Sequence, residues 1–296
     1  MAKVVIFDGN AIMHRAFHAL PPMTTPNGAP INAVYGLVSM LYKVIFDLRP
    51  THIIFAFDRP EPTFRKRILK SYQAHRPEMD ESLSPQFEKA HEIIQSFKIP
   101  IYSKAGFEAD DVIGTIANMI NKNILIVTGD RDMLQLVQGK TKLYMPGKGL
   151  SDATEYGPRE TRERMGVPPE QIVDYKALVG DPSDNYKGVP GIGPKTAVSL
   201  LGKYYTLDNI YSHVSEIKES VAKKLIEHKT SAYQSQKLAK IVTDVDIDFK
   251  LGNAREWNLY NPGSEQVFKT FGFRSLAKRA QDIEQAKLKE TQQNLF

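Results

Sequence analysis

Three hydrophobic segments of this chain each end at an aspartate, and this repetition constrains the fold more than any other feature. The segments span residues 4–8, 53–58 and 124–130, and they end at Asp8, Asp58 and Asp130. Each segment has the length and the β-branched content of a strand buried inside a parallel sheet. Because parallel strands end at one edge of the sheet, where ligands bind, we expect these three carboxylates to lie close together.

Carboxylates that lie close together repel one another. Two ionised carboxylates about 4 Å apart, at an effective dielectric constant near 20, cost roughly 4 kcal/mol. Divalent cations with oxygen ligands are a common way to neutralise such a group. The three strand ends therefore predict a metal site.

Helical and strand patterns alternate through the first half of the chain. Helices are expected over residues 32–48, 85–97 and 108–120, with short strands at 99–102 and around Leu143. This alternation predicts an α/β fold with a mostly parallel central sheet flanked by helices. We expect this core at 1–157, a helical region at 158–281 and a flexible polar tail at 282–296.

The composition excludes several classes of site. The 296 residues include no cysteine, which rules out disulfides, thiolate zinc sites and a cysteine nucleophile. Lys and Arg outnumber Asp and Glu by 39 to 34, which suits a polyanionic partner, although an ordinary solvated surface gives the same excess. With no secretion signal and no membrane-spanning segment, we expect a soluble, cytoplasmic monomer without a membrane partner.

Six more acids occur in short blocks and extend the acidic set. They are Glu108, Asp110, Asp111, Asp132, Asp181 and Asp184. The first three open an expected helix, where acids also suit the helix dipole. The last two would share one face of a helical turn, but an Asx-capped turn explains them equally well.

All nine acids together are hard to explain as helix caps. Oxygen ligands without His or Cys favour Mg²⁺, with Mn²⁺ as a substitute, over zinc. So many carboxylates exceed the needs of one ion, and two ions about 3.5–4 Å apart are typical of phosphodiester hydrolysis by in-line displacement. In that reaction one ion activates water and the other stabilises the leaving oxygen.

A glycine-rich segment at 188–197 gives a second strong signal. Gly191 and Gly193 permit a tight turn whose following backbone N–H groups point at a phosphate, and Lys195 and Thr196 come next. The pattern predicts a helix-hairpin-helix that contacts the DNA backbone without reading bases. A simple packing corner between two helices is the alternative.

Basic and aromatic residues are interleaved directly after Asp58. The basic residues are Arg59, Arg65, Lys66, Arg67, Lys70 and Arg76, and the aromatic ones include Phe64 and Tyr72. Such a mixture suits single-stranded nucleic acid, whose phosphates pair with cations while its bases stack on rings. A solvated amphipathic helix would carry the same pattern.

In chain order, five sequence blocks resemble the 5′-nuclease (flap endonuclease) family. They are FDGN at 7–10, FAFD at 55–58, EADD at 108–111, TGDRD at 128–132 and GDPSDN at 180–185. The resemblance is closest to the 5′→3′ exonuclease domain of bacterial DNA polymerase I and extends to about residue 284. With no room for a polymerase domain, we expect either a stand-alone nuclease or an excised domain.

The resemblance implies a PIN-like nuclease core and a role for each acidic block. It assigns Asp8, Asp58, Glu108, Asp110 and Asp111 to a first metal, directly or through water, and Asp130, Asp132, Asp181 and Asp184 to a second. It also implies that residues 59–97 form an arch over the active site, in which Arg76 acts in catalysis. The hairpin would hold duplex DNA and bind K⁺ through its carbonyl groups.

One position departs from the family pattern. The arch motif of the family reads Tyr-Lys-x-x-Arg, whereas here Tyr72 is followed by Gln73. A glutamine in this DNA-contacting position cannot supply the charge of a lysine. Because of Gln73, a catalytically weak DNA-junction-binding protein remains an alternative to the nuclease. A PIN-like ribonuclease is a weaker alternative.

The last five residues resemble the pentapeptide that binds the bacterial sliding clamp. Gln292 leads the segment, and Leu295 and Phe296 end it. Two apolar residues at the end of a polar tail indicate a binding role, but the signal is short and chance explains it equally well. The sequence as a whole predicts a Mg²⁺-dependent, structure-selective 5′ nuclease that acts on flapped, nicked or branched DNA in replication and repair.

Overall fold

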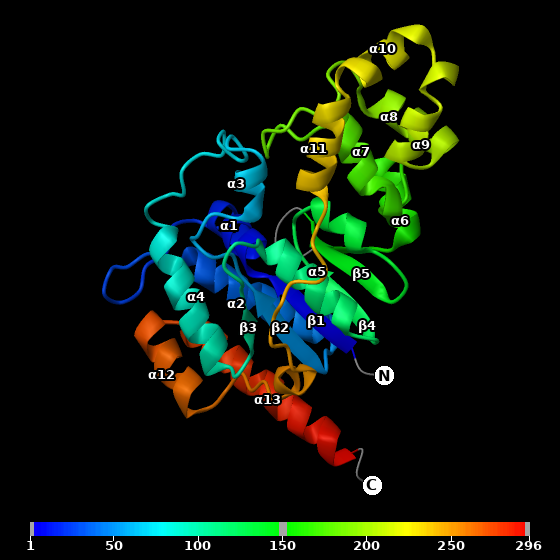
Figure 1. The fold of residues 1–296 in the computed structure, drawn as a ribbon. Helices are drawn as coiled ribbons and strands as arrows, with labels where there is room; N and C mark the ends of the chain where they lie inside the picture. Colours follow the sequence, from blue (N-terminus) through cyan, green and yellow to red (C-terminus); the bar gives the residue numbers. More distant parts are fainter. Residues whose placement is uncertain (1–2, 148–152, 294–296) are drawn as a thin grey trace.

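A six-stranded sheet with helices on both faces forms the centre of the molecule (Figure 1). The computed structural model describes residues 3–147 and 153–293. The strands are β1 (Lys3–Asp8), β2 (His52–Ala56), β3 (Ile101–Tyr102), β4 (Asn123–Val127), β5 (Thr141–Pro146) and β6 (Ala153–Tyr156). Their order is β3-β2-β1-β4-β5-β6, and only β6 runs antiparallel to its neighbour. The mostly parallel α/β sheet is thus confirmed. The antiparallel edge strand was not predicted, because residues 153–156 lack a hydrophobic run.

The register of the strands brings their carboxyl ends to one edge. Val5 of β1 lies opposite Ile53 of β2 and Leu125 of β4. Asp8 is the last residue of β1, and Asp58 and Asp130 follow shortly after the ends of β2 and β4. The alignment that the hydrophobic runs predicted therefore holds in the fold.

Side chains of β1 alternate between two hydrophobic cores, as expected for a strand with period two. Val5 and Phe7 enter the core that contains α1 (Gly9–Ala19), α2 (Asn32–Leu48), α4 (Ser84–Ser96), α12 (Pro262–Phe271) and α13 (Arg274–Gln293). Val4 and Ile6 enter the core beneath α5 (Ala109–Met119). Helix α1 was not predicted, and it begins at once after Asp8, whose side chain caps it by accepting from the Ala11 N–H (2.9 Å).

The second half of the chain is helical, as predicted. Its helices are α6 (Pro158–Met165), α7 (Ile172–Val179), α8 (Pro194–Tyr204), α9 (Leu207–Ser212), α10 (Glu219–Glu227) and α11 (Lys229–Ala239). Helices α8 to α10 project from the sheet (Figure 1). The segment 188–197 contains the end of the loop from α7 and the first turn of α8, so the turn of the predicted hairpin lies between two helices. Short helix α3 (Phe64–Ile68) lies in the basic segment.

The prediction of a flexible tail from residue 282 onward is wrong for most of the described part of that tail, because α13 continues to Gln293. Ile283 packs on the hydrophobic core, and Glu284 accepts from the Leu259 N–H (2.8 Å). The Lys287 ammonium lies 3.6 Å from the centre of the Trp257 ring. Leu259 and Trp257 precede their partners in the helix by 25 and 30 residues, so the polar sequence of the helix does not reveal them. Among the described ranges, no helix is both long and apolar enough to cross a bilayer.

Candidate active site

The strand ends and the start of α5 enclose an acidic cavity of about 390 Å³. Asp8, Asp58, Asp110 and Asp130 line it, and we call these four residues the first cluster. They come from three strand ends and one helix start, so segments distant in sequence meet here. None of the four forms an ion pair with a Lys, Arg or His side chain of residues 3–147 and 153–293.

Neutral hydrogen bonds hold the first cluster in place. The Thr128 hydroxyl donates to Asp8 Oδ2 (2.6 Å), and the backbone N–H of Ala109 donates to Asp58 Oδ1 (2.7 Å). Asn10 fixes the backbone at Asp58 by accepting from its N–H (2.8 Å). Sequence reasoning did not single out Thr128 or Asn10, although both stand within the motif blocks.

Burial makes ionisation of Asp8, Asp58 and Asp110 unfavourable. It raises the pKa of Asp8 to about 7, although the Thr128 hydroxyl opposes the change. Burial and the charges of Asp130 and Asp8 raise the pKa of Asp110 far above its ordinary value, and burial also raises the pKa of Asp58. A divalent cation would relieve this destabilisation, so the first cluster suits such an ion in charge. Among the described residues, however, only the second cluster described below brings three carboxylate oxygens within 4.8 Å of one another.

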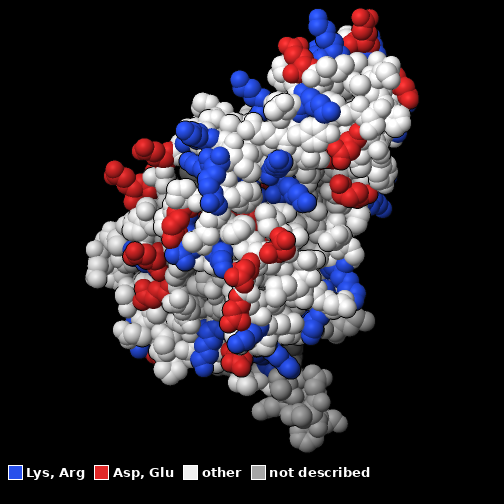
Figure 2. Space-filling model, in the orientation of Figure 1, with Lys and Arg blue, Asp and Glu red and all other residues white. Residues whose placement is uncertain are grey.

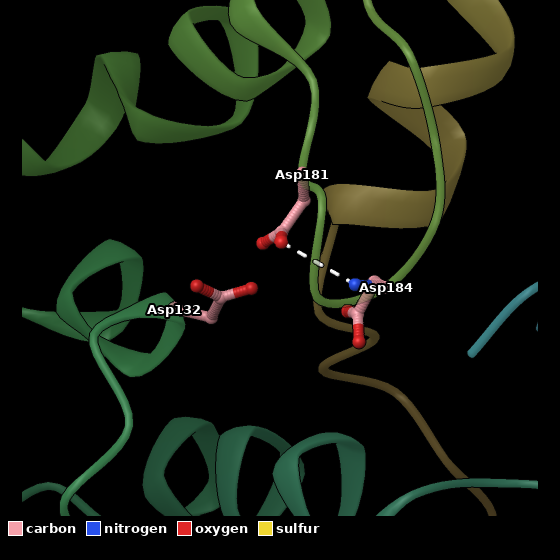
Figure 3. Close-up of side chains that lie close together, drawn as sticks. All are labelled: Asp132, Asp181 and Asp184. Carbon is pink, nitrogen blue, oxygen red and sulfur yellow. Dashed lines mark hydrogen bonds between the residues drawn. The ribbon is translucent and has the colours of Figure 1, made fainter. Parts of the chain in front are cut away.

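A second group of acids lies beside the first. Asp132 begins the short helix η1 (Asp132–Leu136), and Asp181 and Asp184 lie in the turn after α7. One carboxylate oxygen from each lies within 4.8 Å of the others, and we call these three residues the second cluster (Figure 3). Asp132 and Asp181 point toward one another, and the Asp184 N–H donates to Asp181 Oδ1 (3.3 Å).

Unlike the first cluster, the second cluster is neutralised by cations of the protein itself. The buried Lys176 ammonium contacts Asp132 and donates to Asp181 Oδ2 (2.6 Å). The Arg76 guanidinium donates to Asp184 Oδ1 (2.6 Å). Burial opposes ionisation of Asp181, but Lys176 outweighs it and lowers the pKa of that carboxyl, whereas burial still raises the pKa of Asp132 to about 6.

Sequence reasoning missed Lys176. The available signal was that it is the only basic residue in α7 and stands shortly before the acidic turn. Its oxygen partners come from two separate elements, which the sequence alone does not bring together. The acids of the second cluster fit a metal ion chemically, but Lys176 and Arg76 must release them first.

Tyr72 and Glu108 connect the two clusters. The Tyr72 hydroxyl donates to Asp184 Oδ2 (3.0 Å) and lies 3.3 Å from Glu108 Oε2. Burial raises the pKa of Glu108 to about 7, although Arg65 opposes the change. Because Tyr72 is buried, the expectation that it stacks on a DNA base is wrong, and its hydroxyl instead bridges carboxylates.

Two further assignments from the sequence need correction. The side chains of Arg65 and Asp111 are only 3% and 0% exposed and form a two-pronged ion pair (2.7 and 2.9 Å). Arg65 is therefore not available to DNA phosphates. Asp111 does not line the cavity, and its oxygens are used by Arg65, so its expected role as a metal ligand is not supported.

The other residues of the expected arch lie at the surface or at the cavity. Figure 2 shows Lys and Arg side chains gathered around α3, and Lys66 in this helix and Lys70 just after it are exposed. Arg76 is half exposed and lines the cavity. Gln73 also lines the cavity, with φ of +57° and its N–H donating to the Asp184 carbonyl (3.0 Å).

The hairpin has an exposed turn on a buried anchor. Gly191, Gly193 and Lys195 are exposed and Thr196 is half-buried, whereas the flanking Val189 and Ile192 are buried. Two of the hairpin carbonyls are already used inside the protein. Those of Gly188 and Gly191 accept from Ser231 (2.7 Å) and Lys224 (3.0 Å). Each of these two oxygens therefore has one of its two lone pairs already engaged, which disfavours the expected K⁺ ion.

The expected clamp-binding peptide falls at the limit of the described structure. Gln292 belongs to the last turn of α13, and Leu295 and Phe296 lie outside the described residues.

Comparison with known proteins identifies the family. Residues 3–166 match the model of the 5′-3′ exonuclease N-terminal resolvase-like domain, and residues 167–260 match the 5′-3′ exonuclease C-terminal SAM fold. The chain is 38% identical to DNA polymerase I of Bacillus caldotenax over 281 residues and 36% identical to that of Bacillus subtilis. Each match covers 94% of this chain but 32% of the relative, so the chain spans about a third of the relatives' length. The chain belongs to the 5′-3′ exonuclease family.

Solved structures show the same fold. The T5 5′-exonuclease with bound zinc has a TM-score of 0.66 at 20% identity, and the match covers 96% of this chain and 98% of that one. The catalytic core of Rad2 in complex with DNA has a TM-score of 0.58 at 17% identity, with 95% and 91% covered. These likenesses agree with a nuclease core followed by a helical region.

Proposed function

We propose that this chain is a divalent-metal-dependent, structure-selective 5′ nuclease that cleaves DNA at 5′ flaps and at nicked or recessed 5′ ends. The observation that carries the proposal is the first cluster, in which four carboxylates converge on one cavity without a cationic partner in the described part of the chain. The exposed cations of the arch lie next to this cavity, where they suit a phosphodiester chain.

The residues of the site divide the task between holding metal and holding DNA. Divalent ions bound by the carboxylates would supply an activated water and stabilise the leaving oxygen. Arg76 lines the same cavity and can pair with a phosphate once it leaves Asp184. The exposed turn of the hairpin, with Lys195, can hold duplex DNA at its backbone. We expect products with a 5′-phosphate and a 3′-hydroxyl.

Cleavage of a labelled 5′-flap substrate tests the proposal. The chain should cut the flap with Mg²⁺ and, less selectively, with Mn²⁺, but not with chelator, and Asp130→Ala should remove the activity. A single-stranded oligonucleotide and a blunt duplex of the same sequence test structure selectivity. Tight flap binding without cleavage at any Mg²⁺ concentration would reject the nuclease assignment.

A DNA-junction-binding protein with little catalysis is the second candidate. Two observations favour it: Lys176 and Arg76 occupy the oxygens of the second cluster, and Gln73 stands where the family has a lysine. This candidate predicts equal flap affinity with Mg²⁺ and with chelator, and no product after prolonged incubation. The intact first cluster favours the nuclease.

We propose two partners beyond DNA and metal, each with its own test. Removal of residues 292–296 should leave cleavage of free oligonucleotides unchanged but abolish capture by a bacterial sliding clamp, and unchanged capture would reject the peptide. A K⁺ ion at the hairpin predicts tighter duplex binding in KCl than in NaCl at equal ionic strength. The engaged carbonyls of Gly188 and Gly191 disfavour that K⁺ effect. We also expect a monomer by sedimentation.

A further inference from the structure

A buried arginine ties together three parts of the molecule that are far apart in sequence. Arg65 belongs to α3 at the base of the arch. Its guanidinium donates to both oxygens of Asp111 on α5 (2.7 and 2.9 Å). The same side chain donates to the carbonyls of Leu238, at the end of α11 (2.9 Å), and of Lys240 (3.0 Å). One side chain thus joins the arch, the helix that carries Glu108 and Asp110, and the chain that leaves the hairpin-bearing helices.

The chain that leaves α11 lies directly across α5. We call residues 240–245 the strap, and Figure 1 shows it passing from α11 over α5. Asp111 Oδ1 accepts from the Val242 N–H (2.9 Å), and the Thr115 hydroxyl accepts from the Val245 N–H (3.1 Å). The contact is close enough to require a glycine, because a Cβ on Gly114 would lie 2.8 Å from a methyl group of Ile241. The strap and α5 therefore have a fixed mutual position.

Arg65 also acts on a carboxylate of the cavity. Its Nη1 lies 3.4 Å from Glu108 Oε2 and 2.7 Å from Asp111 Oδ2. Asp111 is thus the nearer partner, and its charge satisfies the guanidinium. If Asp111 lost that charge, Glu108 would become the remaining acidic partner of a buried cation and would be drawn toward it.

We propose that Arg65 and Asp111 form a positioning pair. Asp111 is the counter-ion of Arg65 and not a metal ligand. Arg65 fixes the positions of the strap and of Glu108 relative to the metal-binding start of α5. This proposal rests on the nuclease function proposed above. It assigns to the pair the task of aligning the DNA-holding helices with the carboxylates.

The affinity of the protein for Mn²⁺ without DNA, measured by electron paramagnetic resonance of the free ion, separates a ligand from a counter-ion. Asp111→Asn should weaken Mn²⁺ binding about tenfold, because Arg65 then attracts Glu108. The double variant Arg65→Met/Asp111→Leu removes both charges and should restore the affinity to within about threefold of the wild type. If Asp111 is a ligand, the double variant stays as weak as Asp111→Asn, and the proposal is overturned.

Asp110→Asn provides the matched control, because it changes the neighbouring carboxylate that lines the cavity. Its loss of Mn²⁺ affinity should persist when Arg65→Met is added. Rescue of Asp110→Asn by Arg65→Met would mean that removal of Arg65 strengthens metal binding whatever carboxylate is missing, and the pairing argument would fail. Thermal melts of each variant show whether it is folded. If Asp111→Asn does not fold, the double variant still decides the question by comparison with the wild type.

A second readout tests alignment. In single-turnover cleavage at saturating Mg²⁺, the double variant should cut a 5′ flap about tenfold more slowly while its flap Kd stays within about threefold. Arg65→Lys keeps the positive charge but loses the fork of guanidinium donors. Its cleavage rate should therefore lie between that of the wild type and that of the double variant. A double variant with the wild-type rate would overturn the positioning role. If the wild type cuts no flap, the proposed function fails, whereas the Mn²⁺ comparison still reports on the pair.

Discussion

The two carboxylate clusters lie side by side but satisfy their charges in opposite ways. The first cluster lines the cavity without an ion-pair partner among the described residues, and burial raises the pKa of Asp8, Asp58 and Asp110. The second cluster has Lys176 between two of its acids and Arg76 on the third. A metal ion that enters the first cluster displaces no ion-paired side chain of the described residues, whereas one that enters the second must displace Lys176 or Arg76. We therefore expect the first cluster to bind metal more tightly.

The largest test of this difference compares Asp110→Asn with Asp181→Asn. Asp110→Asn should remove the tighter metal site and lower the rate of flap cleavage by more than about 100-fold. Loss of a residue that only supports a metal ligand costs up to about 100-fold, so loss of a ligand itself should cost more. Asp181→Asn should leave the tighter metal site intact and lower the rate of flap cleavage by less. Mn²⁺ titration calorimetry and cleavage rates measure both effects. Asp248→Asn, at a side chain that is 86% exposed, serves as the control.

The result would contradict the comparison if Asp181→Asn removed the tighter metal site and Asp110→Asn spared it. In that case the ammonium of Lys176 would not act as a competitor of the ion. The clusters would then differ in geometry alone.

A second test removes the internal cation of the second cluster. Lys176→Met leaves Asp132 and Asp181 without their ammonium, so the metal-free protein should lose about 2 kcal/mol of stability, less than for a fully buried pair. The stabilisation by added Mn²⁺ should become larger, because the ion no longer competes with a lysine. Thermal melts with chelator and with Mn²⁺ measure both changes. An unchanged response to Mn²⁺ would show that Lys176 does not occupy the ion's position.

The convergence of the strand-end aspartates of the first cluster could be predicted, because a short-range sequence pattern specifies it. Hydrophobic runs that end at Asp8, Asp58 and Asp130 determine parallel strands, and parallel strands end at one edge of the sheet. The hairpin motif is equally local, because its glycines and its apolar anchors are neighbours in sequence. Such features need only the pattern and the rules of the sheet.

The roles of Arg65, Tyr72 and Lys176 could not be predicted, because each depends on a partner far along the chain. Arg65 has the same charge as Lys66, yet one is buried against Asp111 and the other is exposed. Composition treats the two residues alike, and only the packing of α3 on α5 and α11 separates them. The helical tail was missed for the same reason, since Trp257 supports it from outside the helix.

A pH titration of stability sharpens the comparison in the metal-free protein. The pKa values of Asp8 and Glu108 are raised to about 7 and that of Asp132 to about 6. The folded state therefore holds protons that the unfolded state has already released, so stability should fall as pH rises from about 4 to about 7 and then level off. Mn²⁺ should cancel the fall. Melts at half-unit pH steps, with chelator and with Mn²⁺, measure it.

Asp8→Asn gives the control for this titration. It removes one of the groups with a raised pKa, so the fall in stability above pH 5 should become shallower. A melting temperature that is constant or rises between pH 5 and 7 in chelator would mean that the acids of the cavity are already ionised, and the contrast between the clusters would be lost.

The smallest expected effect concerns Gln73, which follows Tyr72 in the sequence and contacts Arg76. Gln73 lines the cavity, and its amide accepts from Arg76 Nη2 (3.2 Å) in the orientation that satisfies both groups. In Gln73→Lys, a second cation beside Arg76 would repel the guanidinium and leave it freer to pair with a phosphate. We expect flap cleavage to rise roughly threefold, or about 0.7 kcal/mol.

Gln73→Met separates charge from shape, because it has a similar length without a charge. Single-turnover rates at saturating Mg²⁺ should rise for the lysine variant alone. Equal gains in both variants would attribute the effect to loss of the amide contact with Arg76, and a loss with lysine would mean that a further cation near Asp184 hinders metal entry. The last outcome would extend the contrast between the clusters, because the second would then already carry as much internal positive charge as cleavage tolerates.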